Sequence, residues 1–315
     1  MGAFALLRLG AVSLLGLHSA VLAHDVTAEA PLVGWSLPWN FEPWVISCLA
    51  VSGALYAVGL LRLWRHAGVG HGVRISHAVS FAGGWLFLVV ALVSPLDPLG
   101  TRLFSAHMVQ HELLMVIVAP LMVVGRPLAV WTWALPKEWR RTAGWFTQRT
   151  AWAELWRFLT WPLVAWLLHA AALWLWHIPP FFEVALVNNG WHTLQHASFL
   201  VTALFFWWAV LGTVQRASQG AALGYLFTTM VHTGALGALL TLSPTVWYPT
   251  YLSTAASLGI LPLEDQQLGG LVMWVPAGLV YLAAGLALAA RWLERTATRR
   301  RSRYDRIGSS DVAQV

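Results

Sequence analysis

Long apolar stretches separated by short polar segments run through the sequence from residue 43 onward. An α-helix needs about 20 predominantly apolar residues to cross the hydrocarbon core of a bilayer. Spans of this kind are expected at residues 43–62, 77–95, 102–125, 158–177, 190–212, 221–243 and 266–291. The pattern therefore predicts an all-α, polytopic membrane protein with a seven-helix transmembrane bundle.

The two ends of the chain differ from these stretches. Residues 1–23 have the pattern of a cleavable signal peptide, because Arg8 precedes an apolar run and a small-residue cleavage site ends at Ala23. An uncleaved first helix is the alternative. Residues 24–42 are then expected to form a periplasmic segment, residues 43–292 the bundle, and residues 293–315 a basic cytoplasmic tail.

Composition and charge fit this interpretation. Hydrophobic residues make up 58% of the chain and charged residues only 10%, unlike a soluble domain. All basic residues except Arg8 and Arg102 fall in the loops of one side or in the tail. Because cytoplasmic loops are enriched in arginine and lysine, we expect a periplasmic N-terminus and a cytoplasmic C-terminus in a bacterial plasma membrane. The net charge of +6 then indicates contact with membrane lipids and not with nucleic acid. The single cysteine, Cys48, excludes a Cys-x-x-Cys metal shuttle.

The main candidate site consists of two histidine pairs inside predicted spans. His107 and His111 are four residues apart in the third span, and His192 and His196 repeat this spacing in the fifth. Residues four apart share one helix face, and a metal ion can bridge imidazoles so placed. Ionisable groups inside a membrane are costly and usually functional. The second motif follows the first by 85 positions, which predicts a repeated helical hairpin.

Other side chains at similar depth extend the candidate set. Imidazole suits copper, zinc or iron, and the thioether of Met108 would favour Cu(I). Glu112 would be a hard ligand, a proton carrier or a protonated acid bonded to a neighbouring helix. Asp265 either overhangs the same cavity or complements a helix N-terminus. The metal candidates are His107, His111, His192, His196, Met108, His232, Glu112 and Asp265.

Five segments together resemble a known family. They are residues 94–97, 104–111, 119–121, 191–196 and 265–274, distributed over the bundle from about residue 35 to residue 292. The chain is similar to the polytopic CtaG-like cytochrome c oxidase assembly proteins, which assist caa3-type oxidases. The resemblance implies a role in respiratory-chain biogenesis, with haem-copper cytochrome c oxidase subunits as partners and copper as the delivered metal.

Four interpretations of the histidines stay open. The favoured one is a non-catalytic assembly factor that handles copper for insertion into the oxidase. The second is a haem-binding protein with bis-histidine ligation between the third and fifth spans. The third is a membrane metalloenzyme with Glu112 or Asp265 as its acid–base group, although the sequence carries no substrate signature. The fourth is a metal-free scaffold for oxidase subunits, in which the histidines only hydrogen-bond between helices.

Overall fold

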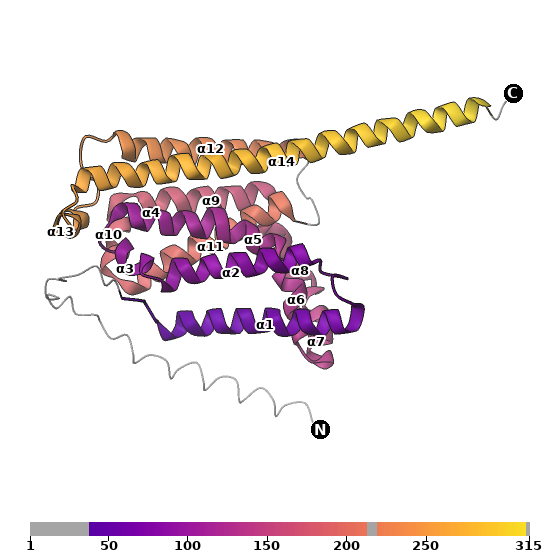
Figure 1. The fold of residues 1–315 in the computed structure, drawn as a ribbon, viewed down its shortest axis with the longest axis horizontal. Helices are drawn as coiled ribbons and strands as arrows, with labels where there is room; N and C mark the ends of the chain where they lie inside the picture. The colour runs from indigo at the N-terminus through magenta and orange to yellow at the C-terminus, as the bar shows by residue number, and fades with distance from the viewer. Residues whose placement is uncertain (1–37, 213–218, 313–315) are drawn as a thin grey trace, which may run out of the picture. The chain divides into compact units, whose positions relative to one another are not determined.

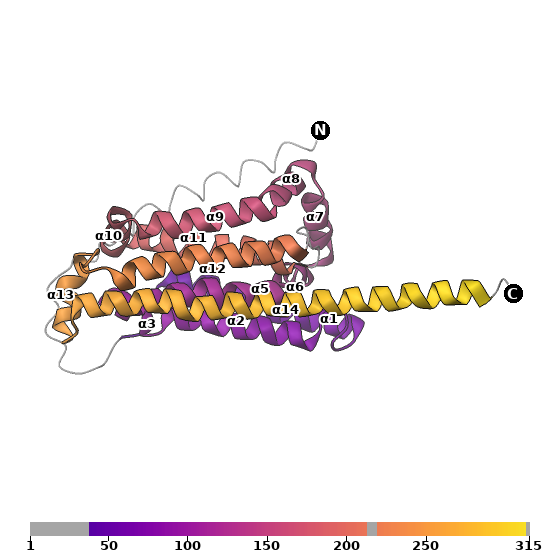
Figure 2. The same ribbon diagram turned by 90° about the horizontal axis from the view of Figure 1, so that it is seen from above.

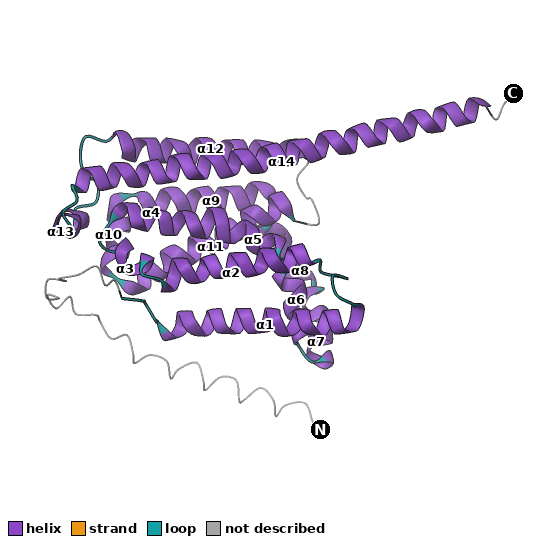
Figure 3. Cartoon of the chain, in the orientation of Figure 1, coloured by secondary structure: helices purple, strands orange, loops and turns teal. Residues whose placement is uncertain are grey.

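The computed structural model describes residues 38–212 and 219–312, and this part of the chain is α-helical without strands (Figure 3). Six of its helices are long and apolar enough to cross a membrane. A bent pair, α8 (Thr150–Leu159) and α9 (Pro162–His177), gives a seventh span if it is counted as one. The predicted signal peptide lies outside the described residues.

The helices match the spans that the hydropathy pattern predicts. They are α1 (Pro43–Ala67), α2 (Ile75–Val93), the segment Phe104–Val124, the bent pair, α11 (Asn189–Leu211), α12 (Gln219–Leu242) and α14 (Pro262–Val312). Large apolar side chains face outward, among them Leu86, 59% exposed, and Leu279, 61% exposed. Of the four paired histidines, three are buried and His192 is half-buried. Such an apolar exterior suits lipid and not water. The protein is an all-α polytopic membrane protein, as the pattern predicts.

Short helices interrupt three of the connections between spans. They are α3 (Leu96–Gly100), α10 (Pro179–Val187) and α13 (Thr250–Ser257), and they lie at the same end of the bundle (Figure 1). We call this end the connection end. Each unit consists of a span, a short helix and a returning span, and the prolines at 95, 179 and 249 stand at or next to the short helices. The predicted hairpin repeat is thus present, and α12–α13–α14 forms a third copy.

The opposite connection, between the third and fourth spans, contains α6 (Pro127–Ala134), α7 (Lys137–Thr147) and α8. The sequence indicates one amphipathic helix over residues 136–157, but the structure has two, because Arg149, with ψ of 135°, leaves the helical conformation. Neither α7 nor α8 contains a buried residue. The guanidinium of Arg149 lies 3.6 Å above the ring of Trp145, a cation–π contact that pairs the basic and aromatic residues of this segment.

A π-helical turn divides the third span. The span consists of α4 (Phe104–Glu112), the π turn η1 (Leu113–Val118) and α5 (Ala119–Val124). Pro120 follows the turn and has no N–H to donate back along the helix. The indole of Trp207 donates a hydrogen bond of 2.9 Å to the carbonyl of Met115 within the turn. A π turn changes the rotational phase of a helix. As a result, α4 packs mainly against α14, whereas α5 packs against α2 and α11.

Two glycines set the close approach of α12 and α14, which run side by side (Figure 2). A Cβ on Gly270 would lie 2.6 Å from the carbonyl oxygen of Gly237 and 2.7 Å from the nitrogen of Thr241.

We expect Gly270→Ala to destabilise the protein by about 1–3 kcal/mol, because the added methyl forces the helices apart. Thermal unfolding in detergent measures this. The control is Gly278→Ala in the same helix, where the nearest atom is 4.0 Å away. Equal midpoints for the two variants would contradict the prediction.

Candidate metal centre

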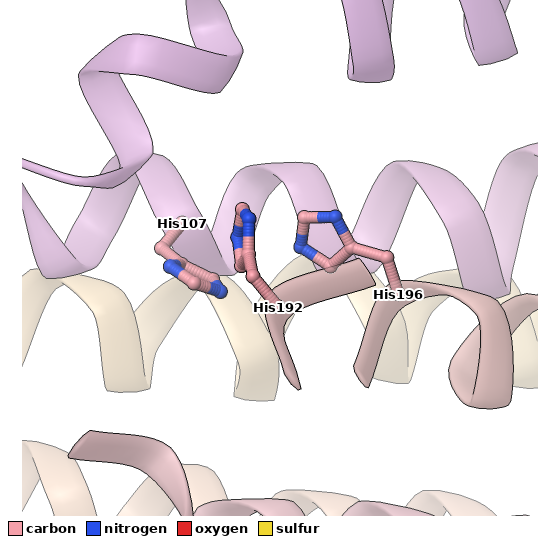
Figure 4. Close-up of side chains that lie close together, drawn as sticks. All are labelled: His107, His192 and His196. Atoms are coloured by element: carbon pink, nitrogen blue, oxygen red, sulfur yellow. The ribbon is translucent and has the colours of Figure 1, made fainter. Parts of the chain in front are cut away.

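Three histidines from two helices converge near the connection end of the bundle. His107 comes from α4, and His192 and His196 come from α11 (Figure 4). One ring nitrogen from each can be chosen so that the three atoms lie within 4.8 Å of one another. We call these residues the histidine triad. Among the described residues, no other group of three or more histidine, cysteine or acidic side chains meets this criterion.

Two further imidazoles adjoin the histidine triad. The ring centroid of His111 lies 4.3 Å from that of His107 and 5.1 Å from that of His196. His177, at the end of α9, is 6.1 Å from His111 by the same measure. His107, His111 and His177 are each at most 2% exposed. The site is therefore a layer of five imidazoles, of which the sequence motifs identify four, while His177 is indicated only by its position at the end of the fourth span.

Hydrogen bonds orient two of these rings. The phenol of Tyr251, in α13, donates to the carbonyl of Gly100 at 2.8 Å, and burial raises the pKa of this phenol well above its ordinary value. Because its proton is committed, the oxygen of Tyr251 accepts from Nδ1 of His107 at 3.1 Å. Nδ1 of His177 is likewise 2.6 Å from the carbonyl of Leu173. We assign the Nδ1–H tautomer to both rings, which leaves each Nε2 lone pair available to a metal.

The remaining ring nitrogens include many buried atoms without a hydrogen-bond partner. They are Nε2 of His107, His177, His192 and His196, and both ring nitrogens of His111. Buried polar atoms without partners are rare in folded proteins, and each costs free energy. A cluster of them on neighbouring rings fits a site that holds a cation through neutral imidazoles.

Aromatic side chains cover the histidine layer on the side of α13. Phe104, Phe182, Tyr248 and Tyr251 are all at most 2% exposed, and the ring of Phe182 lies 5.1 Å from that of His107. The phenol of Tyr248 donates to the carbonyl of His177 at 2.9 Å. Glu183 of α10 accepts hydrogen bonds from the backbone N–H and the hydroxyl of Thr250, at the start of α13. The short helices and these aromatic rings therefore cover the histidine layer on this side.

Asp265 is not part of the histidine triad. Its carboxylate accepts from the backbone N–H of Phe104 at 2.6 Å and from that of Ser105 at 3.1 Å, and the Ser105 hydroxyl also donates to it. These bonds satisfy the free N–H groups at the start of α4. Met108 is fully buried and packs with Phe104 and Met273 towards α14. Its Cγ would lie 3.2 Å from a Cβ on Gly269 of that helix.

His232 and Glu112 lie outside the histidine triad as well. The ring of His232 is 5.8 Å from that of Trp166. A charge on His232 would act electrostatically on His169. Glu112 is close enough to Tyr281 for electrostatic interaction, and its Oε2 has no hydrogen-bond partner. Of the eight sequence candidates, the structure thus brings together four histidines. It leaves Met108, His232, Glu112 and Asp265 in other surroundings.

The fold and the site together define a polytopic helical membrane protein with a buried imidazole cluster. The family model for "Cytochrome c oxidase caa3 assembly factor (Caa3_CtaG)" matches residues 54–295. The chain belongs to this family, which confirms the resemblance seen in the sequence.

Curated relatives come from mycobacteria. Uncharacterized proteins of Mycobacterium bovis and Mycobacterium tuberculosis are each 27% identical over 317 residues, which covers 93% of this chain and 46% of theirs. An uncharacterized protein of Mycobacterium leprae is 26% identical over 296 residues, covering 86% of this chain and 43% of its own. The chain therefore spans about half the length of the curated relatives it matches. No solved structure matches the chain.

Proposed function

We propose that the protein is an assembly factor for a haem-copper cytochrome c oxidase and that it holds copper at the histidine triad before the metal enters the oxidase. The convergence of three ring nitrogens within 4.8 Å of one another carries this proposal. Membership of the caa3 assembly-factor family supports the oxidase as the client. His111, next to the histidine triad, offers a further imidazole for the ion. No catalytic residue is part of the proposal, and the oxidase subunits are the proposed partners.

The donor set supports cuprous copper as the cargo. Imidazole binds copper, zinc and iron, so ligand type alone does not select the metal. The histidine triad itself, however, supplies no carboxylate or thiolate ligand. Burying an uncompensated charge is costly, and the cost rises steeply with the charge of the ion. Neutral ligands in a buried site therefore favour Cu(I) over divalent zinc or iron.

The charge distribution supports a location in the bacterial plasma membrane. With a periplasmic N-terminus and a cytoplasmic C-terminus, the connection end and the histidine layer lie on the periplasmic side. The basic segments around α7 and in the C-terminal part of α14 then face the anionic lipids of the inner leaflet. Copper bound near the connection end would then lie on the same side of the membrane as the extracytoplasmic face of an oxidase subunit.

Metal analysis of the purified protein tests the proposed function. After anaerobic loading with Cu(I) and removal of free metal, we expect about one copper per chain, retained against excess Zn²⁺. The absorption spectrum is expected to show no Soret band. Failure to retain stoichiometric copper would contradict the proposal. A Soret band would instead support bis-histidine haem ligation between α4 and α11.

A further inference from the structure

A cavity of about 300 Å³ is lined mainly by α1, α2 and α11. His192 and His196 form part of its wall, and most of the rest is apolar, including Val45, Leu88 and Leu200. Nε2 of His196 has no hydrogen-bond partner, and the residue is 8% exposed. The cavity thus reaches two members of the histidine triad.

Two half-buried carboxylates, Glu42 and Asp97, line this cavity, and we call them its rim. Asp97 accepts from the amide of Asn40 at 2.6 Å, and Glu42 accepts from the amide of Asn189 at 3.0 Å and from an indole N–H. These donors are neutral, so they fix the carboxylates in place without cancelling their negative charge. Both carboxylates act electrostatically on His192. A negative rim above neutral imidazoles attracts a cation towards the site.

Cys48 of α1 also lines the cavity. It is the only cysteine in the chain, and it is exposed. A thiol, imidazoles and apolar walls are poor partners for a strongly hydrated divalent ion and better ones for soft Cu(I). A thiol-directed reagent would modify this wall at a single position. Cys48 therefore allows the cavity to be blocked covalently without replacing a histidine.

We propose that this cavity is the route by which a cuprous ion reaches the histidine triad, with Glu42 and Asp97 drawing the ion to its mouth. This inference rests on the proposed function, because it presumes that the histidine triad holds copper. It assigns Glu42, Asp97 and the α1 face around Cys48 to metal uptake. The histidines themselves retain the ion.

Blocking Cys48 tests the route. A bulky aromatic maleimide on Cys48 is expected to lower the rate of Cu(I) uptake about tenfold or more. Restricted access to a binding site can change association rates by this much. The final copper content stays at the unmodified level. Cys48→Ala protein is the control, and its rate of loading should be the same with and without the reagent. A modified protein that loads copper as fast as the unmodified one would overturn the route alone. Failure of the unmodified protein to bind copper would overturn the proposed function as well.

Removing a negative charge at the rim provides a second test of the uptake route. Glu42→Gln is expected to slow uptake by about two- to tenfold at low ionic strength, and the difference should disappear in high salt. Glu138→Gln in α7 removes the same charge at the opposite end of the bundle and should leave the rate unchanged. Equal slowing in both variants, or a difference that is insensitive to salt, would overturn the role of the rim.

Discussion

Replacing His107, His192 and His196 together by alanine is expected to abolish stoichiometric copper binding and to leave host membranes deficient in active oxidase. Each substitution removes a ligand outright. The loss of affinity should therefore exceed the roughly 10–100-fold that changes in outer-shell partners of a metal site cause. The variant also loses stability, because it leaves cavities in place of three imidazole rings and removes the hydrogen bond between His107 and Tyr251. Copper content is therefore measured on the folded fraction. Copper analysis of the purified variant and oxidase activity in membranes measure the two effects.

The matched control replaces two histidines elsewhere in the bundle. His232 acts electrostatically on His169, and both lie outside the histidine triad. The double variant His169→Ala, His232→Ala removes similar chemistry and should keep about one copper per chain. Normal oxidase maturation in the triple variant would contradict the proposed function. It would support the metal-free scaffold, in which histidines serve only the packing of helices.

The hydropathy pattern was sufficient to predict the spans, because lipid tolerates only helices whose backbone groups are satisfied internally. The spacing of His107 to His111 and of His192 to His196 was sufficient to place each pair on one helix face. Their convergence follows from the hairpin repeat, since corresponding returning helices bring both motifs to the same depth. The structure places them together as that reasoning predicts.

Contacts between distant helices were not predictable in the same way. The direction in which Met108 points depends on the rotation of α4 about its axis. The π turn at Leu113–Val118 and the packing of α4 on α14 determine this rotation. His177 lies in the layer as the last residue of α9, where the phenol of Tyr248 donates a hydrogen bond to its carbonyl. The segment Asp265-Gln266-Gln267 at the start of α14 forms hydrogen bonds with other parts of the chain. For example, Gln266 accepts a hydrogen bond from the backbone N–H of Trp247 at 2.6 Å. No local pattern in the sequence predicts which residues these side chains contact.

Asp265 is the clearest case in which a candidate metal ligand has a structural role instead. Its buried carboxylate accepts hydrogen bonds from two backbone N–H groups and one hydroxyl at the start of α4, so it joins the third and seventh spans. A sequence position in the first turn of α14 suggests that the acid complements its own helix, whereas the structure shows it capping another helix 160 residues away in the chain. The consequence for function is indirect: the cap fixes the turn of α4 that begins just before His107.

We therefore expect Asp265→Ala to lower the free energy of unfolding by about 3 kcal/mol or more, because it leaves buried N–H groups unpaired and removes bonds to a charged acceptor. Asp265→Asn keeps the shape and part of the acceptor capacity, so an intermediate loss is expected. Glu264→Ala, at the exposed neighbouring acid, is the control and should change little. Thermal unfolding in detergent and copper content are measured on the same samples. The folded fraction of Asp265→Ala should still bind about one copper, which is the reverse of the pattern expected for the histidine variant. Loss of copper at unchanged stability would instead make Asp265 a ligand and contradict its assignment as a cap.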